Sequence, residues 1–160
     1  MKGRRIVVDT NVAIAANGRD THADELCQLA CIEALTHAAK NVVFLDDNEL
    51  IFNEYARHLN FPGQPGMGDA FFKHVFDHQY SGKKVKLVTV TPSDDHTRGF
   101  EELPVNTLDA SDRKFLAVAV TAKSCILNAT DSDWAENAVL LNRLLVTVEQ
   151  LCPHHCAKVR

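Results

Sequence analysis

The chain has 160 residues, of which 46% are apolar and 24% are charged, and its formal net charge is −4. This length supports one domain with a substantial core but is short for two. No apolar run approaches the ~20 residues of a membrane span, and the run near the N-terminus is too short for a secretory signal. We therefore expect a cytoplasmic protein without a membrane partner. The acidic total does not point to nucleic acid, but a local carboxylate cluster with bound metal would leave that function open.

Short β-branched runs alternate with helical patterns, which predicts an α/β domain with a mainly parallel sheet. The predicted strands are residues 6–8, 42–45, 85–90, 125–127 and 144–148. Six helices are predicted. The first begins near residue 12, the second spans 22–40 behind an N-cap at Thr21, and the third follows residues 46–48. The fourth includes residues 71–79, the fifth runs from 109 or 111 to 123, and the sixth covers 133–142. We expect a single domain over 1–150, a central five-stranded sheet flanked by helices, and a C-terminal tail over 151–160.

The five cysteines fit a reducing compartment. Cys27, Cys31 and Cys125 lie in apolar helix-like or strand-like patterns, so we expect buried thiols there. Residues 152–156 contain two cysteines and two histidines. So tight a group cannot easily close a tetrahedral shell alone, and typical zinc spacings differ, so we expect a frayed tail rather than a zinc site.

Four acidic residues stand where a strand ends or a helix begins. They are Asp9 in VVDTN, Glu54 in IFNEYARHL, Asp112 in DASDRKFLAVA and Asp131 in ILNATDSDW. A parallel sheet gathers its strand ends at one edge, so these side chains can converge there. Converging carboxylates repel one another, and a divalent cation with oxygen ligands relieves the repulsion. We therefore predict a metal site formed by these four acids, with Asp133 as a further ligand.

Each acid also has a structural explanation. Asp9 can cap the helix that follows it, and Glu54 can be a solvated residue at the edge of an amphipathic helix. Asp131 suits a turn. At the helix that begins near residue 110, Asp109 has the stronger claim to the N-cap. Asp112 is therefore the better ligand candidate, with Asp109 in a supporting role.

The ordered set of motifs resembles the PIN-domain nucleases over about residues 5 to 150. VVDTNV resembles that family's opening strand and first acid, NEYARHL its glutamate-bearing helix, and DASDRKFLAVAV its third acid and alanine-rich helix. ILNATDSDW resembles the closing motif, with Trp134 where Phe is commoner. The resemblance implies a PIN-like three-layer fold and a metal-dependent phosphodiesterase acting mostly on RNA, similar to the small prokaryotic PIN-domain ribonucleases that include toxins of toxin–antitoxin pairs. It carries the catalytic acids onto Asp9, Glu54, Asp112 and Asp131, with Asp133 auxiliary and Asn11 orienting Asp9.

The expected chemistry follows from oxygen ligands, which favour Mg²⁺ or Mn²⁺ over Zn²⁺. Such an ion polarises a phosphate and activates water, so we expect water to be the nucleophile. Arg113 and Lys114, beside Asp112, are the candidate phosphate-binding residues, and Phe61 or Trp134 could stack on bases. The expected partners are RNA and an antitoxin-type protein, and a homodimer is left open.

Two other functions fit parts of the sequence. A catalytically inactive PIN-fold chain would serve as an interaction module. A haloacid-dehalogenase-like phosphatase also places an acid after its first strand, but it needs a second acid two residues later. This chain has Asn11 at that position, which weakens the phosphatase alternative.

Overall fold

The computed structural model describes residues 3–62 and 64–156, and within them a five-stranded parallel sheet forms the central layer. The strands are β1 (Arg5–Val8), β2 (Val42–Asp46), β3 (Val85–Val88), β4 (Cys125–Asn128) and β5 (Val148–Gln150). Their order is β3-β2-β1-β4-β5, and every neighbouring pair is parallel. The predicted fold class, an α/β domain with a central five-stranded parallel sheet flanked by helices, is confirmed.

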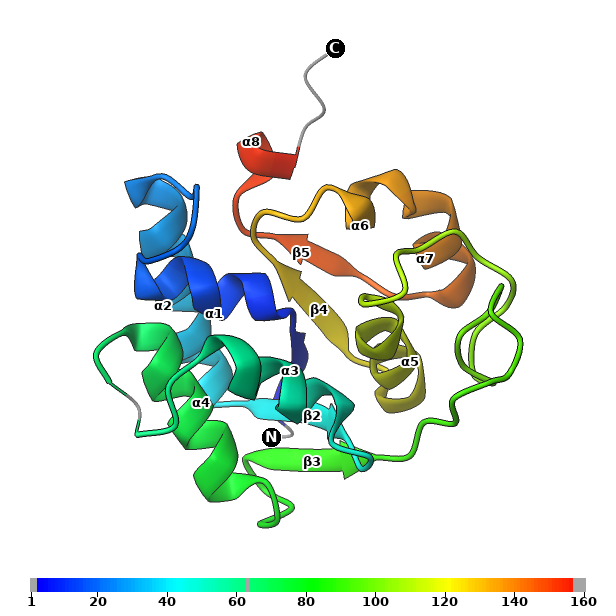
Figure 1. Cartoon of the computed structure of the whole chain (residues 1–160), viewed down its shortest axis with the longest axis horizontal. Coiled ribbons are helices and arrows are strands. Elements are labelled where there is room, and N and C mark those ends of the chain that lie inside the picture. Colours follow the sequence, from blue (N-terminus) through cyan, green and yellow to red (C-terminus); the bar gives the residue numbers. More distant parts are fainter. Residues whose placement is uncertain (1–2, 63, 157–160) are drawn as a thin grey trace.

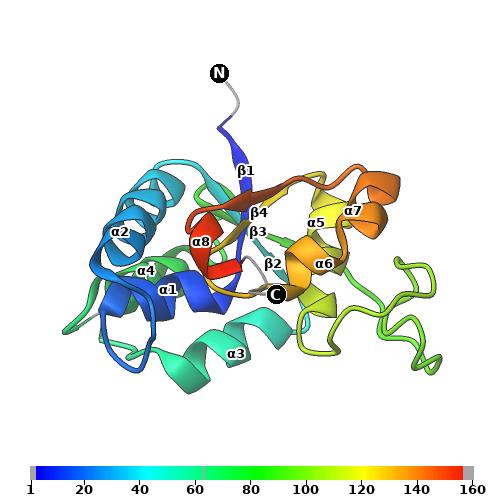
Figure 2. The ribbon, with the colours of Figure 1, turned by 90° about the horizontal axis from the view of Figure 1, so that it is seen from above.

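Helices cover both faces of this sheet (Figures 1 and 2). One face carries α1 (Thr10–Asn17), α2 (Glu25–Ala39) and α4 (Met67–His78). The other carries α5 (Arg113–Ala122), α6 (Asp133–Glu136) and α7 (Ala138–Leu144). Between the two layers, α3 (Leu50–His58) follows the carboxyl end of β2 and contacts both α1 and α5. The short helix α8 (Pro153–Cys156) ends the described part of the chain. Because α3 packs on both layers beyond the strand ends, it adjoins the edge where the predicted acids were expected.

Burial on both faces of the sheet explains the continuous apolar runs by which the sequence predicts β1 and β4. Ile6, Val7 and Val8 have no exposed surface, and Ile126 and Leu127 are buried in the neighbouring strand. Central parallel strands need such continuous apolar runs because helices pack on both sides of the sheet. The central pair β1 and β4 therefore forms the rigid base from which the acidic residues extend.

Asp46, the last residue of β2, fixes the start of α3. Its buried carboxylate accepts hydrogen bonds from the backbone N–H groups of Asn48 (3.1 Å), Leu50 (2.9 Å) and Ile51 (2.9 Å). The first N–H groups of a helix have no partner within the helix, so an acceptor at this point stabilises it. The end of a sheet strand is thereby tied directly to the helix that carries Glu54.

Several predicted element boundaries are displaced, and the starts of α2 and β5 show the cause. The helix α2 has its N-cap at Asp24, and the Thr21 hydroxyl accepts a hydrogen bond from the backbone of Ala23 just before it. The fifth strand begins at Val148 instead of Leu144, because α7 continues to Leu144 and the chain then turns through a left-handed residue. In both places a local turn, which periodicity does not reveal, displaces the boundary.

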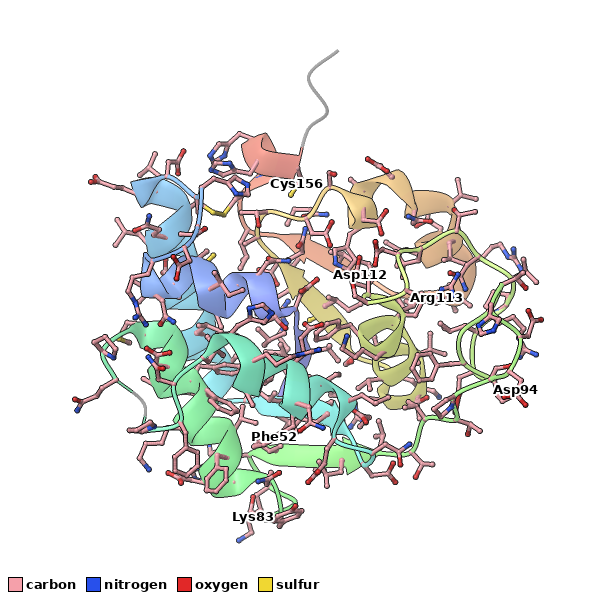
Figure 3. All side chains as sticks on the ribbon, in the orientation of Figure 1. Phe52, Lys83, Asp94, Asp112, Arg113 and Cys156 are labelled. Atoms are coloured by element: carbon pink, nitrogen blue, oxygen red, sulfur yellow. A yellow bond between two sulfur atoms is a disulfide. The ribbon has the colours of Figure 1, made fainter. Side chains whose placement is uncertain are left out.

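The expectation of a free thiol at Cys27 is also wrong, because Cys27 forms a disulfide with Cys152. This bond joins the first turn of α2 to the chain just after β5 and appears as a yellow bond in Figure 3. The described cysteines without a disulfide are Cys31, Cys125 and Cys156. A cytoplasmic location stays a prediction.

The segment expected to be a frayed tail is held in place as far as residue 156. It forms α8, and the His154 imidazole lies 2.8 Å from the carboxylate of Asp24. Residues 157–160 of the predicted tail lie outside the described residues, and the division into a domain over 1–150 and a tail over 151–160 stays a prediction. Across the described ranges, none of the helices is both long and apolar enough to cross a bilayer.

Replacing Asp46 by Ala should destabilise the protein by about 1–2 kcal/mol, because three backbone donors lose a buried acceptor. Urea unfolding followed by circular dichroism measures the change. The matched control is Asp47→Ala at the exposed neighbouring position, whose carboxylate accepts a hydrogen bond from the Thr89 hydroxyl and whose loss should cost within about 0.5 kcal/mol. Equal effects of the two substitutions would contradict the capping role.

Candidate metal centre

Three carboxylates meet at the carboxyl ends of the two central strands. Asp9 directly follows β1, and Asp131 lies three residues beyond the end of β4. Asp112 immediately precedes α5, where Figure 3 labels it. Each of the three offers a carboxylate oxygen, and these oxygens all lie within 4.8 Å of one another. Parallel strands explain the convergence of Asp9 and Asp131, while the packing of α5 against the sheet supplies Asp112.

Burial makes this cluster unfavourable for three free negative charges. Asp9 is 5% exposed, Asp112 is 7% exposed, and Asp131 is partly buried. Desolvation raises the pKa of Asp9 to about 7, with further contributions from the charges of Asp131 and Glu54. Desolvation likewise raises the pKa of Asp112 to about 9, assisted by the charges of Asp9 and Asp131. Without a cation, the cluster therefore retains protons at neutral pH.

Trp134 positions Asp9 and opposes part of this shift. The buried indole N–H donates a 2.8 Å hydrogen bond to Oδ2 of Asp9, and this bond lowers the pKa of Asp9. The backbone N–H of Asn11 donates more weakly to Oδ1, at 3.4 Å. Because Trp134 has no exposed surface, the expectation that it could stack on a base is wrong. Phe61 is 52% exposed, and its stacking role stays a prediction.

The side chain of Asn11 holds the turn after β4. Its amide donates to Oδ1 of Asn128 at 2.9 Å, and its carbonyl oxygen accepts from the backbone of Ala129 at 2.8 Å. Asn128, which is fully buried, also donates to the backbone carbonyl of Asp131 at 2.8 Å. Asn11 was predicted to orient Asp9. Its side chain instead joins the ends of β1 and β4, and its backbone N–H is the group that donates to Asp9. Asn128 is not among the predicted site residues, and its sequence signal is an amide at the end of an apolar strand.

Glu54 adjoins the three aspartates and is paired with a cation of the protein itself. Its carboxylate lies 2.7 Å from the Lys114 ammonium and accepts a hydrogen bond from the Thr10 hydroxyl. The Glu54 and Lys114 side chains are 13% and 12% exposed, so the ion pair is largely shielded from water. The Tyr55 hydroxyl next to it donates to the Val8 carbonyl at 2.5 Å and fixes α3 against β1. Glu54 thus reaches the border of the cluster, while its role as a metal ligand stays a prediction.

Asp133 and Asp109 lie beside the cluster in different roles. One carboxylate oxygen of Asp133 accepts from the backbone N–H of Asp109 at 2.9 Å, and the proximity of Asp133 contributes to the raised pKa of Asp112. Asp109 accepts from the backbone and hydroxyl of Ser111, and the first of these bonds is the main cause of its lowered pKa. The N-cap of α5 is Asp112 and not Asp109, and the Asp112 side chain makes no capping bond. This carboxylate is therefore available to the cluster.

Arg113 points toward the long loop before α5, while Lys114 points toward the cluster. The Arg113 guanidinium donates to the side-chain oxygen of Asn106 (3.1 Å) and to the backbone carbonyl of His96 (2.7 Å). Figure 3 shows Arg113 at the start of α5, on the side of this loop. The phosphate-binding roles of Arg113 and Lys114 stay predictions. The observed contacts give Arg113 a part in holding the loop.

Comparisons with protein-family models, with curated protein sequences and with solved structures found no match for this chain. The candidate site comprises a parallel α/β sheet and a buried triad of Asp9, Asp112 and Asp131 that could bind a metal ion. Three anionic oxygen donors are the ligand type that hard divalent cations prefer.

In the metal-free protein, Asp112→Asn should increase stability at pH 8 by about 1 kcal/mol or more, because each unit of pKa displacement corresponds to about 1.4 kcal/mol. The unfolded chain loses these protons near pH 4, whereas the folded chain keeps them until about pH 7 at Asp9 and about pH 9 at Asp112. Raising the pH between these values therefore favours the unfolded wild type. Urea unfolding in chelator from pH 5 to 9 should show a shallower loss of stability for the variant.

The control for this experiment is Asp94→Asn, which removes one exposed negative charge in the distant loop labelled in Figure 3. Its stability should stay within about 0.5 kcal/mol of wild type. An Asp112→Asn protein that is less stable than wild type at every pH would contradict the crowding of charge at the triad.

Trp134→Phe should weaken Mn²⁺ binding about fivefold at pH 7, because roughly one further unit of upward shift in the pKa of Asp9 lowers its ionised fraction by that factor. The deficit should shrink at pH 9, where Asp9 is ionised in both proteins. Isothermal titration calorimetry at the two pH values measures it. The packing control is Phe44→Leu, which alters the buried core in β2. A deficit of equal size at both pH values would show that the hydrogen bond to Asp9 is not its cause.

Proposed function

We propose that this chain is an Mg²⁺- or Mn²⁺-dependent endoribonuclease that hydrolyses phosphodiester bonds of single-stranded RNA. The observation that carries the proposal is the convergence of Asp9, Asp112 and Asp131 in a buried site with oxygen atoms within 4.8 Å. Such a group is costly for folding unless a proton or a cation offsets its charge. The donor set fits a hard divalent cation, which supports metal binding as the purpose of the cluster.

The choice of RNA rests on the resemblance of the ordered motifs to PIN-domain nucleases. That resemblance is strengthened by the parallel sheet, because Asp9 and Asp131 follow its adjacent central strands as the motif order implies. We assign Glu54 to the same site as the fourth catalytic acid and Asp133 as an auxiliary acid, since both adjoin the triad. Asn11 supports it by joining the turns that carry Asp9 and Asp131.

In this proposal, a bound Mg²⁺ or Mn²⁺ would polarise a phosphate oxygen and lower the pKa of a water molecule. The carboxylates of Asp9, Asp112 and Asp131 would hold the ion. Trp134 keeps Asp9 oriented through its N–H, and the Lys114 ammonium pairs with the Glu54 carboxylate beside the triad. Lys114 is also the cation best placed to attract a substrate phosphate at the site, at the expense of its pairing with Glu54.

The two alternatives differ from this proposal at identifiable points. An inactive interaction module would have no reason to retain a complete buried triad, although it would share the fold. A haloacid-dehalogenase-like phosphatase would need an acid at the position of Asn11. That side chain is instead engaged with Asn128 and Ala129, which supports the nuclease over the phosphatase.

The proposed partners follow from the function. RNA is the substrate, and an antitoxin-type protein would be the natural regulator if the chain is a toxin. Self-association into a homodimer is compatible with the same activity. A short neighbouring reading frame that encodes a binding partner would support the toxin assignment.

Incubation with end-labelled single-stranded RNA and Mn²⁺ tests the proposed activity. We expect cleavage by wild type, its loss in chelator, and a reduction of about 100-fold in Asp112→Asn, equivalent to about 2.7 kcal/mol of transition-state stabilisation. Asp94→Asn, the exposed matched control, should cleave like wild type.

Two outcomes would favour the alternatives. Metal binding without RNA cleavage above the Asp112→Asn background would support the interaction module. Hydrolysis of a small phosphate ester that requires Asp9 but is indifferent to Glu54→Gln would support the phosphatase.

A further inference from the structure

A cluster of sulfur atoms lies where the start of α2 meets the C-terminal segment, separate from the acidic triad. Cys27, Cys31 and Cys152 place their sulfur atoms within 4.8 Å of one another. Each of these residues is at most 1% exposed. Cys27 and Cys152 share a disulfide, and the third sulfur, the free thiol of Cys31, lies beside it.

The fold, and not the local sequence, assembles this cluster. Cys27 and Cys31 are four residues apart on α2 and so occupy the same face of the helix. Cys152 arrives from the chain after β5, where the backbone N–H of Leu151 donates to the Asn128 carbonyl at 2.9 Å. The compact group at residues 152–156 could not complete a metal site alone, but α2 supplies the two ligands that it lacked.

Two imidazole groups lie on α8, directly after Cys152 in the chain. Asp24, His154 and His155 form an adjoining group with ligand atoms within 4.8 Å of one another. The backbone N–H of Asp24 donates to Nε2 of His155 at 3.3 Å, and Asp24 in turn caps the helix turn that contains Cys27. The backbone N–H of His155 also donates to the Cys152 carbonyl at 2.9 Å. The His155 side chain is 16% exposed, and this backbone bond holds the residue close to Cys152 in space.

We propose that Cys27, Cys31 and Cys152 form a zinc-binding site when their disulfide is reduced, with His155 as the fourth ligand. Three cysteines and one histidine are a common ligand set for tetrahedral structural zinc. Thiolates select soft or borderline cations such as Zn²⁺, whereas the carboxylates of the acidic triad select Mg²⁺ or Mn²⁺. The two sites would thus discriminate between metals, and this inference is independent of the proposed nuclease activity.

The two states of the cluster exclude one another. A dithiol reductant delivers two electrons and two protons to the Cys27–Cys152 bond, which yields two thiols while the reductant becomes a disulfide. Zn²⁺ then displaces the thiol protons of the three cysteines, which pass to the buffer. In an oxidising compartment the disulfide persists, and in a reducing compartment the three thiols become available to the metal.

Metal titration of the full chain tests this site, with Co²⁺ as a spectroscopic probe and Zn²⁺ as its competitor. The protein is reduced with a dithiol, and the reductant is then removed under anaerobic conditions. We expect one equivalent of Co²⁺ to give a sulfur-to-cobalt charge-transfer band, and Zn²⁺ to displace it and raise the melting temperature. The oxidised protein should give no such band, because only one free thiol remains in the cluster.

Cys31→Ser is the informative variant, because it keeps the Cys27–Cys152 disulfide and its fold can be verified in the oxidised state. Loss of even a supporting group costs about 10- to 100-fold in metal affinity, so loss of this ligand should cost at least as much. Cys125→Ser, which removes a free thiol on β4, is the matched control and should bind like wild type. Cobalt held by the acidic triad gives no sulfur charge-transfer band, so the outcome does not depend on the nuclease proposal.

The proposal is overturned if the reduced wild type gives no charge-transfer band, or if Cys31→Ser binds Zn²⁺ as tightly as wild type. An unchanged Zn²⁺ affinity in His155→Ala would overturn the assignment of the fourth ligand.

Discussion

Three carboxylates share a largely dehydrated space at the carboxyl edge of the sheet, and the arrangement of the candidate site depends on this crowding. Asp9 and Asp131 are brought there by two adjacent parallel strands, and Asp112 by the start of α5. Burial and mutual repulsion raise the pKa of Asp9 and of Asp112. The folded chain must therefore hold either protons or a cation at this point, which makes metal binding and proton release two aspects of one equilibrium.

The surrounding structure opposes the repulsion by fixing Asp9, the turn that leads to Asp131, and Glu54. Trp134 binds Asp9 from the buried side, and Asn11 joins the two strand ends. Lys114 neutralises Glu54, so the fourth acid adds less net charge to the triad than its position would suggest. These contacts come from four different parts of the chain. Several contacts together oppose the repulsion between the carboxylates, so the loss of any one of them leaves the others in place.

The sequence predicts the sheet well because the sheet depends on local patterns, whereas Asp112 reaches the other two aspartates only through the packing of α5. The apolar runs identify the central strands, and parallel pairing then places Asp9 and Asp131 at one edge. Local patterns do not predict side-chain contacts between segments that are distant in the sequence. Nothing local shows that Trp134 turns its N–H toward Asp9, and the disulfide partner of Cys27 depends on where the chain passes after β5. Turn chemistry accounts for the displaced start of α2, where Asp24 caps the helix in place of the predicted Thr21.

Anomalous diffraction from crystals soaked in MnCl₂ at pH 8 would test the central claim most directly. A single strong manganese peak between the carboxylates of Asp9, Asp112 and Asp131 is the predicted result. Manganese bound elsewhere on the molecule, or a triad that remains metal-free at saturating Mn²⁺, would contradict the claim that these three buried acids form a cation site.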